Sequence, residues 1–278
     1  MKIVKTNAEI ASLLKNYTKV QSIGFVPTMG SLHEGHIALI ERSIESCDIT
    51  VCSIFINPTQ FDSKNDFINY PKNVNSDLLK LKESNCDIVF IPEKRELYSK
   101  GEEAKEYDFG MLSKTMEGKF RIGHFNGMAT IVEKLIKIIQ PSKAFFGEKD
   151  LQQLQIVKEL VRKMKISTEI IGVPTIREEN GLAKSSRNKL LTKSQAKDAV
   201  LIYDCLYFCI INKNIGIKKL RSHILNNFND KENIKLEYVE FVSIQTMNPI
   251  QKWCNEGESA ICIAAYVNEV RLIDNIIL

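Results

Sequence analysis

The chain has 278 residues, of which 44% are apolar and 26% charged, which is the composition of an ordinary globular protein. Its net charge of +4 is mild and its Lys and Arg residues are dispersed, so the sequence lacks the basic surface typical of nucleic-acid binding. It also lacks a secretion signal, a membrane-length apolar run and any Cys-x-x-Cys pair among its seven cysteines, so we expect a cytoplasmic protein with free thiols, bound to neither nucleic acid nor membrane.

The first 175 residues alternate between strand-like and helix-like patterns. Apolar runs rich in β-branched residues predict strands at 22–26, 48–56, 86–92, 144–146 and 168–173. Helical spacing of apolar residues predicts helices at 7–16, from 32 to about 44, and at 74–82, 130–139 and 149–164. Alternation of this kind is typical of a parallel sheet with helices on both faces.

The pattern changes after residue 180. Two helices are expected at 192–212 and 217–228, followed by strands at 235–246, 259–267 and 270–277. We therefore predict an α/β protein with a Rossmann-like N-terminal domain, residues 1–176, and a smaller α+β C-terminal lid domain, residues 177–278.

Four polar segments begin where predicted strands end. They are residues 27–36, 57–61, 147–150 and 174–177. In parallel sheets, ligands bind beyond the carboxyl ends of the strands. One edge of the sheet should therefore gather these segments into one cleft.

The segment 27–36 joins a predicted strand to a predicted helix. Ser31 and Glu34 have the spacing of a capping box, which predicts a helix beginning at Leu32. His33 and His36 would then share one face of its first turn, where free backbone N–H groups and the helix dipole favour phosphate. A zinc site is the alternative, but His-Glu-Gly-His lacks the i, i+4 spacing of His-Glu-x-x-His.

Three further clusters have chemistry suited to nucleotide and acid binding. Gln60 is a two-way hydrogen-bonding group at a strand end, although an amide that only stabilises its loop would look the same. Lys149 can reach phosphate, and Asp150 can hold Mg²⁺ directly or through water. Ser185, Ser186 and Arg187 combine two hydroxyl groups with a planar cation, which suits pyrophosphate.

These blocks together resemble one known family. Pro27-Thr-Met-Gly-Ser-Leu-His-Glu-Gly-His36 resembles the His-x-Gly-His signature of nucleotidylyltransferases and, more narrowly, the pantothenate synthetase family. Asn57–Phe61, Gly118–Gly127, Phe146–Leu154 and Arg177–Asn188 are similar to other blocks of that family, in the same order.

The resemblance implies ATP-dependent condensation of pantoate with β-alanine through a pantoyl adenylate, with Mg²⁺ and in a homodimer. It implies catalytic roles for His33, His36, Lys149 and Arg187, with His36 as the candidate general acid. It places pantoate at Gln60 and Gln153, β-alanine near Gln60, and the metal at Asp150. The implied ATP contacts are Met29, Gly30, Ser31, Leu32, His33, Glu34, Gly35, His36, Gly147, Glu148, Lys149, Asp150, Ile176, Lys184, Ser185, Ser186 and Arg187.

Two positions depart from the family pattern, and some roles stay open. Lys184 stands where Met or Leu is usual, and Leu151 replaces an aromatic residue. Arg121 and His124 could face the cleft or only position their loop. Another nucleotidyl transferase acting on a different acceptor, or a non-catalytic nucleotide-binding module, would share the histidine turn.

Overall fold

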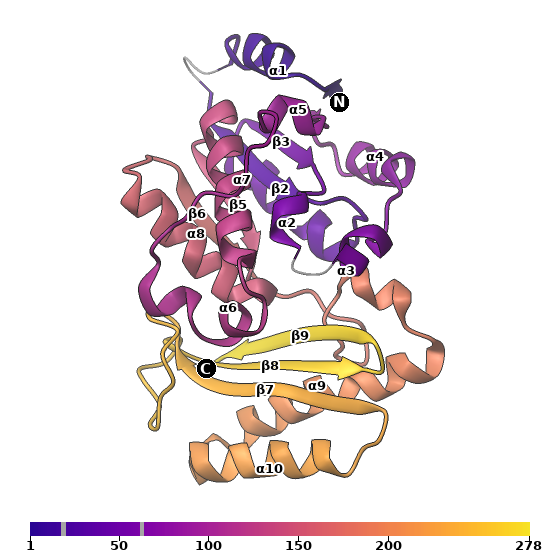
Figure 1. Ribbon diagram of the computed structural model, residues 1–278, viewed down its shortest axis with the longest axis vertical. Coiled ribbons are helices and arrows are strands. Elements are labelled where there is room, and N and C mark those ends of the chain that lie inside the picture. Colours follow the sequence, from indigo (N-terminus) through magenta and orange to yellow (C-terminus); the bar gives the residue numbers. More distant parts are fainter. Residues whose placement is uncertain (18–20, 62–63) are drawn as a thin grey trace.

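The computed structural model describes residues 1–17, 21–61 and 64–278. Its larger sheet has six parallel strands in the order β1-β4-β3-β2-β5-β6 (Figure 1). The strands are β1 (Lys2–Val4), β2 (Ile23–Thr28), β3 (Ile49–Ile54), β4 (Ile88–Phe90), β5 (Lys143–Gly147) and β6 (Glu169–Val173). The strand order reverses direction between β2 and β5, and such a switch point is where doubly wound sheets bind ligands. The predicted Rossmann-like fold is confirmed.

Helices cover both faces of this sheet. They are α1 (Asn7–Leu14), α2 (Glu34–Ser46), α3 (Lys64–Asn69), α4 (Val74–Glu83), α5 (Lys94–Leu97), α6 (Met116–Phe120), α7 (His124–Ile139) and α8 (Leu151–Lys163). Successive strand residues point to opposite faces. Phe25 therefore packs in the cluster that contains α1, α7 and α8, whereas Val26 packs in the cluster that contains α2 and α4. All six residues of β3 are buried, as its apolar sequence predicts.

The C-terminal unit is an antiparallel sheet with two helices. Its strands β7 (Ile234–Ser243), β8 (Ser259–Val267) and β9 (Val270–Ile277) pair in that order, and its helices are α9 (Lys193–Ile211) and α10 (Ile217–Asn229). Phe241 and Ile263 pack in the cluster formed with α9 and α10, whereas Tyr238 and Ala264 pack in the core of the N-terminal unit. The small sheet therefore lies between its own helices and the larger unit (Figure 1).

The sequence misplaced the start of two helices. Helix α7 begins at His124, because Gly127 lies inside it rather than breaking it. A Cβ at Gly127 would come within 2.0 Å of the Thr59 carbonyl oxygen, so the glycine lets the helix approach the segment that carries Gln60. Helix α2 begins at Glu34 instead of Leu32, for a reason found in the site itself.

All seven cysteines are free, as expected, and five of them are buried. Within the described residues, no helix is long and apolar enough to cross a bilayer. The division between residues 176 and 177 stays a prediction.

Candidate functional site

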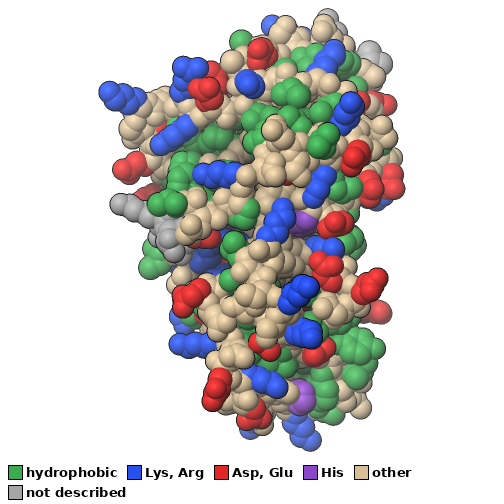
Figure 2. Space-filling view, turned by 90° about the vertical axis from the view of Figure 1, so that its right-hand side faces the viewer, with side chains coloured by type: hydrophobic (Ala, Val, Ile, Leu, Met, Phe, Trp, Pro, Cys, Tyr) green, Lys and Arg blue, Asp and Glu red, His purple; other side chains and the backbone are tan. Residues whose placement is uncertain are grey.

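A single cleft lies beyond the carboxyl ends of β2, β3, β5 and β6, where the sequence placed it. Fourteen of the residues that the sequence assigned to ligands line it: Met29, His33, Gly35, His36, Gln60, Gly147, Lys149, Asp150, Gln153, Ile176, Lys184, Ser185, Ser186 and Arg187. In Figure 2, a histidine is visible near mid-height with basic and acidic side chains around it.

The histidine turn differs from the expected capping box. Ser31 has a positive φ of 51°, and His33, not Ser31, is the N-cap residue of α2. The side chain of Asp77 on α4 stabilises this backbone conformation. Its carboxylate accepts hydrogen bonds from the N–H groups of Ser31 (2.8 Å) and Leu32 (2.7 Å). These two donors are therefore held by a buried carboxylate and are not available to phosphate.

The two histidines cap the helix through their rings. The Gly35 N–H donates to Nδ1 of His33 at 3.1 Å, and the His33 N–H donates to Nδ1 of His36 at 3.3 Å. A ring nitrogen that accepts carries no proton, so each neutral imidazole has its proton on Nε2. Gly35 allows this packing, because a Cβ there would lie 2.9 Å from Cε1 of His33.

Both imidazoles are neutral at pH 7. Burial lowers the pKa of His33 to about 2, helped by the charges of His36 and Lys149. Burial also lowers the pKa of His36 to about 4, with Lys149 adding to the effect and Asp150 opposing it. In the free protein, His33 and His36 are therefore neutral hydrogen-bond donors through Nε2–H and not positively charged acids.

One wall of the cleft is built around Gln60, which is buried in the 3-10 helix Pro58–Gln60. Its side-chain oxygen accepts from Asn57 at 3.2 Å, and its side-chain nitrogen lies 3.0 Å from the sulfur of Met29. Arg121 and His124 also line the cleft, so both face it, which the sequence left open.

A pH dependence of stability follows from His124. Burial, and secondarily the charge of Arg121, lowers its pKa from 6.5 to about 4. Between these values the unfolded state binds the extra proton, so stability is complete above pH 6.5 and falls as the pH drops. Urea unfolding of the wild type should show a mean contribution of about 1 kcal/mol per pH unit from this group between pH 6.5 and 5. His124→Asn, which keeps a donor near the Nδ1 position, should lose that part of the slope; an unchanged slope would contradict the assignment.

The segment after β5 presents the cationic side. Gly147 ends the strand, and a 3-10 helix (Glu148–Asp150) leads into α8. Lys149 is mostly buried and its ammonium lies 3.8 Å from Oδ1 of Asp150. The Asp150 side chain is 47% exposed and lines the cleft, so its carboxylate is open to a cation carried by phosphate.

The Ser-Ser-Arg loop closes the cleft from the C-terminal side. The Ser186 hydroxyl donates to the Ser31 carbonyl oxygen at 3.2 Å, which ties this loop to the histidine turn. Arg187 pairs with Asp66 of α3 at 2.8 Å. The ammonium of Lys184 lies 2.7 Å from Glu178 and 3.2 Å from Glu34, so this unusual lysine is neutralised by two carboxylates.

Five residues assigned to ATP from the resemblance do not line the cleft: Gly30, Ser31, Leu32, Glu34 and Glu148. Ser31 and Leu32 are turned toward Asp77 and Ser186, and Glu34 contacts Lys184. Their assignment to ATP stays a prediction.

The sequence also missed part of the wall. The apolar side chains of α7 line the cleft through Met128, Ile131, Val132 and Leu135. An apolar stripe on a helix looks the same in sequence whether it borders a core or a ligand, so no local signal could have found it.

The comparisons with known proteins agree with this geometry. The family model described as pantoate-beta-alanine ligase matches residues 2–277. The chain belongs to the pantoate–β-alanine ligase family. The pantothenate synthetase of Azobacteroides pseudotrichonymphae is 46% identical over 279 residues, covering 99% of each chain. That of Christiangramia forsetii is 42% identical over 97% of this chain and 96% of the relative.

Solved structures of the same family have the same fold. The pantothenate synthetase from Thermus thermophilus matches with a TM-score of 0.93 at 36% identity, covering 99% of each chain. The pantoate-beta-alanine ligase from Francisella tularensis, solved in complex with β-γ ATP and β-alanine, matches with a TM-score of 0.84 at 36% identity, over 100% of this chain and 97% of that one. The structural similarity therefore extends over both the parallel sheet and the C-terminal unit of this chain.

Proposed function

We propose that this protein condenses pantoate with β-alanine to form pantothenate, with ATP converted to AMP and pyrophosphate. The observation that carries the proposal is the meeting of the histidine turn, Gln60, Lys149 and the Ser-Ser-Arg loop in one cleft. Membership of the ligase family over the whole chain supports the substrates. Membership of this family also argues against a different nucleotidyl transferase.

The reaction proceeds in two steps because a carboxylate does not accept an amine directly. An oxygen of the pantoate carboxylate attacks the α-phosphorus of ATP, and the bond to the bridging oxygen breaks to release pyrophosphate. The neutral amine of β-alanine then attacks the carbonyl carbon of the mixed anhydride, and AMP leaves. Neither step needs a covalent enzyme nucleophile, so the protein acts by positioning and charge stabilisation.

We assign the charge stabilisation to the cationic half of the cleft. The Nε2–H groups of His33 and His36 donate to phosphate oxygens, and Lys149 places a positive charge against them. Ser185, Ser186 and Arg187 receive the departing pyrophosphate. Gln60 and Gln153 orient pantoate so that its carboxylate faces the α-phosphorus.

Asp150 is the residue that fits a magnesium ion. Mg²⁺ is commonly held by one or two carboxylates together with substrate phosphates, and Asp150 offers one exposed carboxylate beside the phosphate-binding lysine. When bound there, Mg²⁺ would neutralise charge on the phosphates. The homodimer is also proposed, and sedimentation should give about twice the chain mass of 31.7 kDa.

Pyrophosphate release tests the proposed reaction. With Mg·ATP and pantoate alone, we expect a burst of about one pyrophosphate per site, because the adenylate stays bound. Addition of β-alanine should convert the burst into steady formation of AMP and pantothenate. Absence of pantoate-dependent pyrophosphate would refute the proposed substrate, and turnover that ignores β-alanine would refute the second step.

A further inference from the structure

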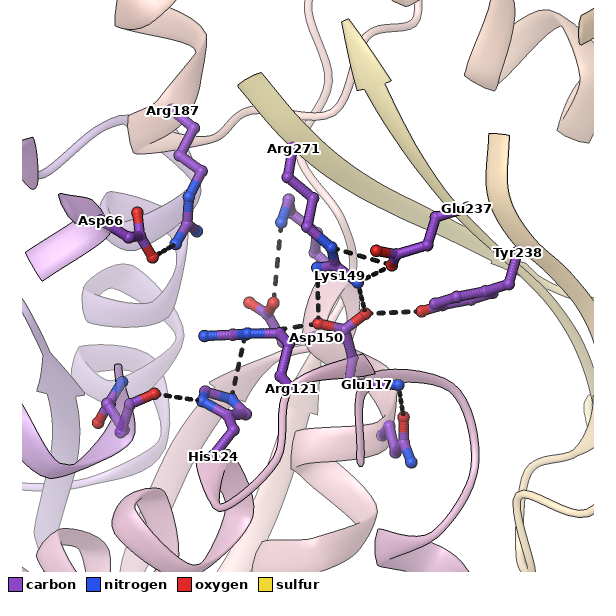
Figure 3. A network of polar contacts seen from close by, with 12 residues as sticks. Asp66, Glu117, Arg121, His124, Lys149, Asp150, Arg187, Glu237, Tyr238 and Arg271 are labelled. Atoms are coloured by element: carbon purple, nitrogen blue, oxygen red, sulfur yellow. Dashed lines mark hydrogen bonds and ion pairs between the residues drawn. The ribbon is translucent and has the colours of Figure 1, made fainter. Parts of the chain in front are cut away.

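A buried carboxylate, Glu117 on α6, connects the C-terminal sheet to the cleft (Figure 3). Its side-chain oxygens accept two hydrogen bonds from Arg271 of β9, at 2.7 and 2.9 Å, and one from the Tyr238 hydroxyl of β7 at 2.8 Å. Burial alone would raise the pKa of Glu117, but the hydrogen bonds and charge of Arg271 lower it to about 2. Glu117 is therefore a fixed negative charge at the junction of the two units.

The same carboxylate holds a residue of the cleft. Nη1 of Arg121 lies 3.4 Å from Oε2 of Glu117, one helical turn away. That guanidinium lies 3.3 Å from Nε2 of His124, and Nδ1 of His124 lies 2.8 Å from the Gln60 carbonyl oxygen. A carbonyl oxygen can only accept, so the proton of this neutral ring is on Nδ1, and Nε2 accepts from Arg121.

These contacts form one continuous chain in which each donor has an acceptor. It runs from Arg271 through Glu117, Arg121 and His124 to the backbone of Gln60. The C-terminal sheet is thus connected by hydrogen bonds to the segment that is expected to hold pantoate, although Arg271 and Glu117 alone are 154 residues apart in sequence.

We propose that Glu117 is a positioning residue for the acid-binding half of the cleft, acting through Arg121 and His124 on pantoate at Gln60. The inference rests on the proposed placement of pantoate. It assigns the docked C-terminal sheet a part in acid binding, because Arg271 and Tyr238 fix the position of the carboxylate that contacts Arg121.

The competing explanation is that Glu117 only joins the two units. Glu237 offers a matched control, because its carboxylate also pairs with Arg271, at 2.6 Å, and is similarly buried. None of its hydrogen bonds or ion pairs given by the structure reaches Arg121. Loss of either carboxylate weakens the junction, but of the two only Glu117 contacts Arg121.

The test compares Glu117→Gln with Glu237→Gln in the full-length protein, after wild-type turnover has been established. Glu117→Gln should raise the KM for pantoate roughly tenfold or more, with the KM for ATP changed less than about twofold, since misplacement affects only the acid side. Glu237→Gln should lower the thermal midpoint to a similar degree with a near-normal KM for pantoate. Equal kinetic effects of the two variants, or a parallel rise in the KM for ATP, would overturn the proposal.

A double-mutant cycle provides the second readout. Arg121→Ala should raise the KM for pantoate by itself, and adding Glu117→Gln to it should cause little further change, because the glutamate acts through that arginine. The measurement on Arg121→Ala remains decisive if Glu117→Gln fails to fold. A normal KM for pantoate in Arg121→Ala would refute the proposed action of Glu117 through Arg121. Absence of pantoate-dependent turnover in the wild type would instead refute the proposed function and this inference with it.

Discussion

Lys149→Ala should reduce the rate of pantoate-dependent pyrophosphate release by about 10²–10³-fold, the usual effect of removing one preorganised charge from a transition state. The Lys149 side chain lines the cleft beside the histidine turn and is only 17% exposed, so solvent screens its charge weakly. Single-turnover measurement of pyrophosphate at saturating ATP isolates this step from product release.

Two variants make this result specific. Lys158→Ala removes an exposed lysine on the outer side of the same helix, α8, and should leave the rate unchanged. His36→Ala should also slow adenylation strongly, because it removes an Nε2–H donor from the cleft. If Lys149→Ala releases pyrophosphate at a near-normal rate and keeps its circular dichroism spectrum, the assignment of Lys149 to the phosphate site is wrong.

Asp77→Ala is expected to cause the largest loss of stability, about 3 kcal/mol, because two buried N–H groups lose their acceptor at about 1–3 kcal/mol each. Asp77 is 2% exposed and accepts from Ser31 and Leu32. The turn that presents these N–H groups to the carboxylate has an unusual backbone, because Gly30 and Ser31 have positive φ angles of 79° and 51°. Since the turn leads directly into His33, adenylation should fall together with stability.

Asn73→Ala separates this effect from damage to α4. Asn73 caps the same helix by accepting the Ser76 N–H at 3.1 Å, but its cap bond does not reach the histidine turn. Urea unfolding should show a loss of about 1 kcal/mol for Asn73→Ala, the usual cost of removing an N-cap. Its pyrophosphate release should be normal. Equal effects of the two variants on activity would mean that Asp77 supports only the helix.

The sequence alone determined the fold class and the position of the cleft. Alternating strand and helix patterns require a parallel sheet, and polar segments that follow its strands must meet at one edge. Gln60 and Lys149 were therefore placed in the cleft from the sequence, since both follow strands that local patterns predict. The Ser-Ser-Arg loop, which lies further from its strand, was placed there by its family resemblance and also lines the cleft.

Only the tertiary structure decided which groups hold the site in place. Asp77 accepts hydrogen bonds from the N–H groups of Ser31 and Leu32, which the local pattern had predicted to bind phosphate. The histidine rings cap the helix in place of Ser31. Glu117 connects two units whose relation no local pattern contains. The physical reason is that helix caps and strand ends depend on neighbouring residues, whereas the partner of a buried charge or an unpaired N–H group is set by how distant segments pack.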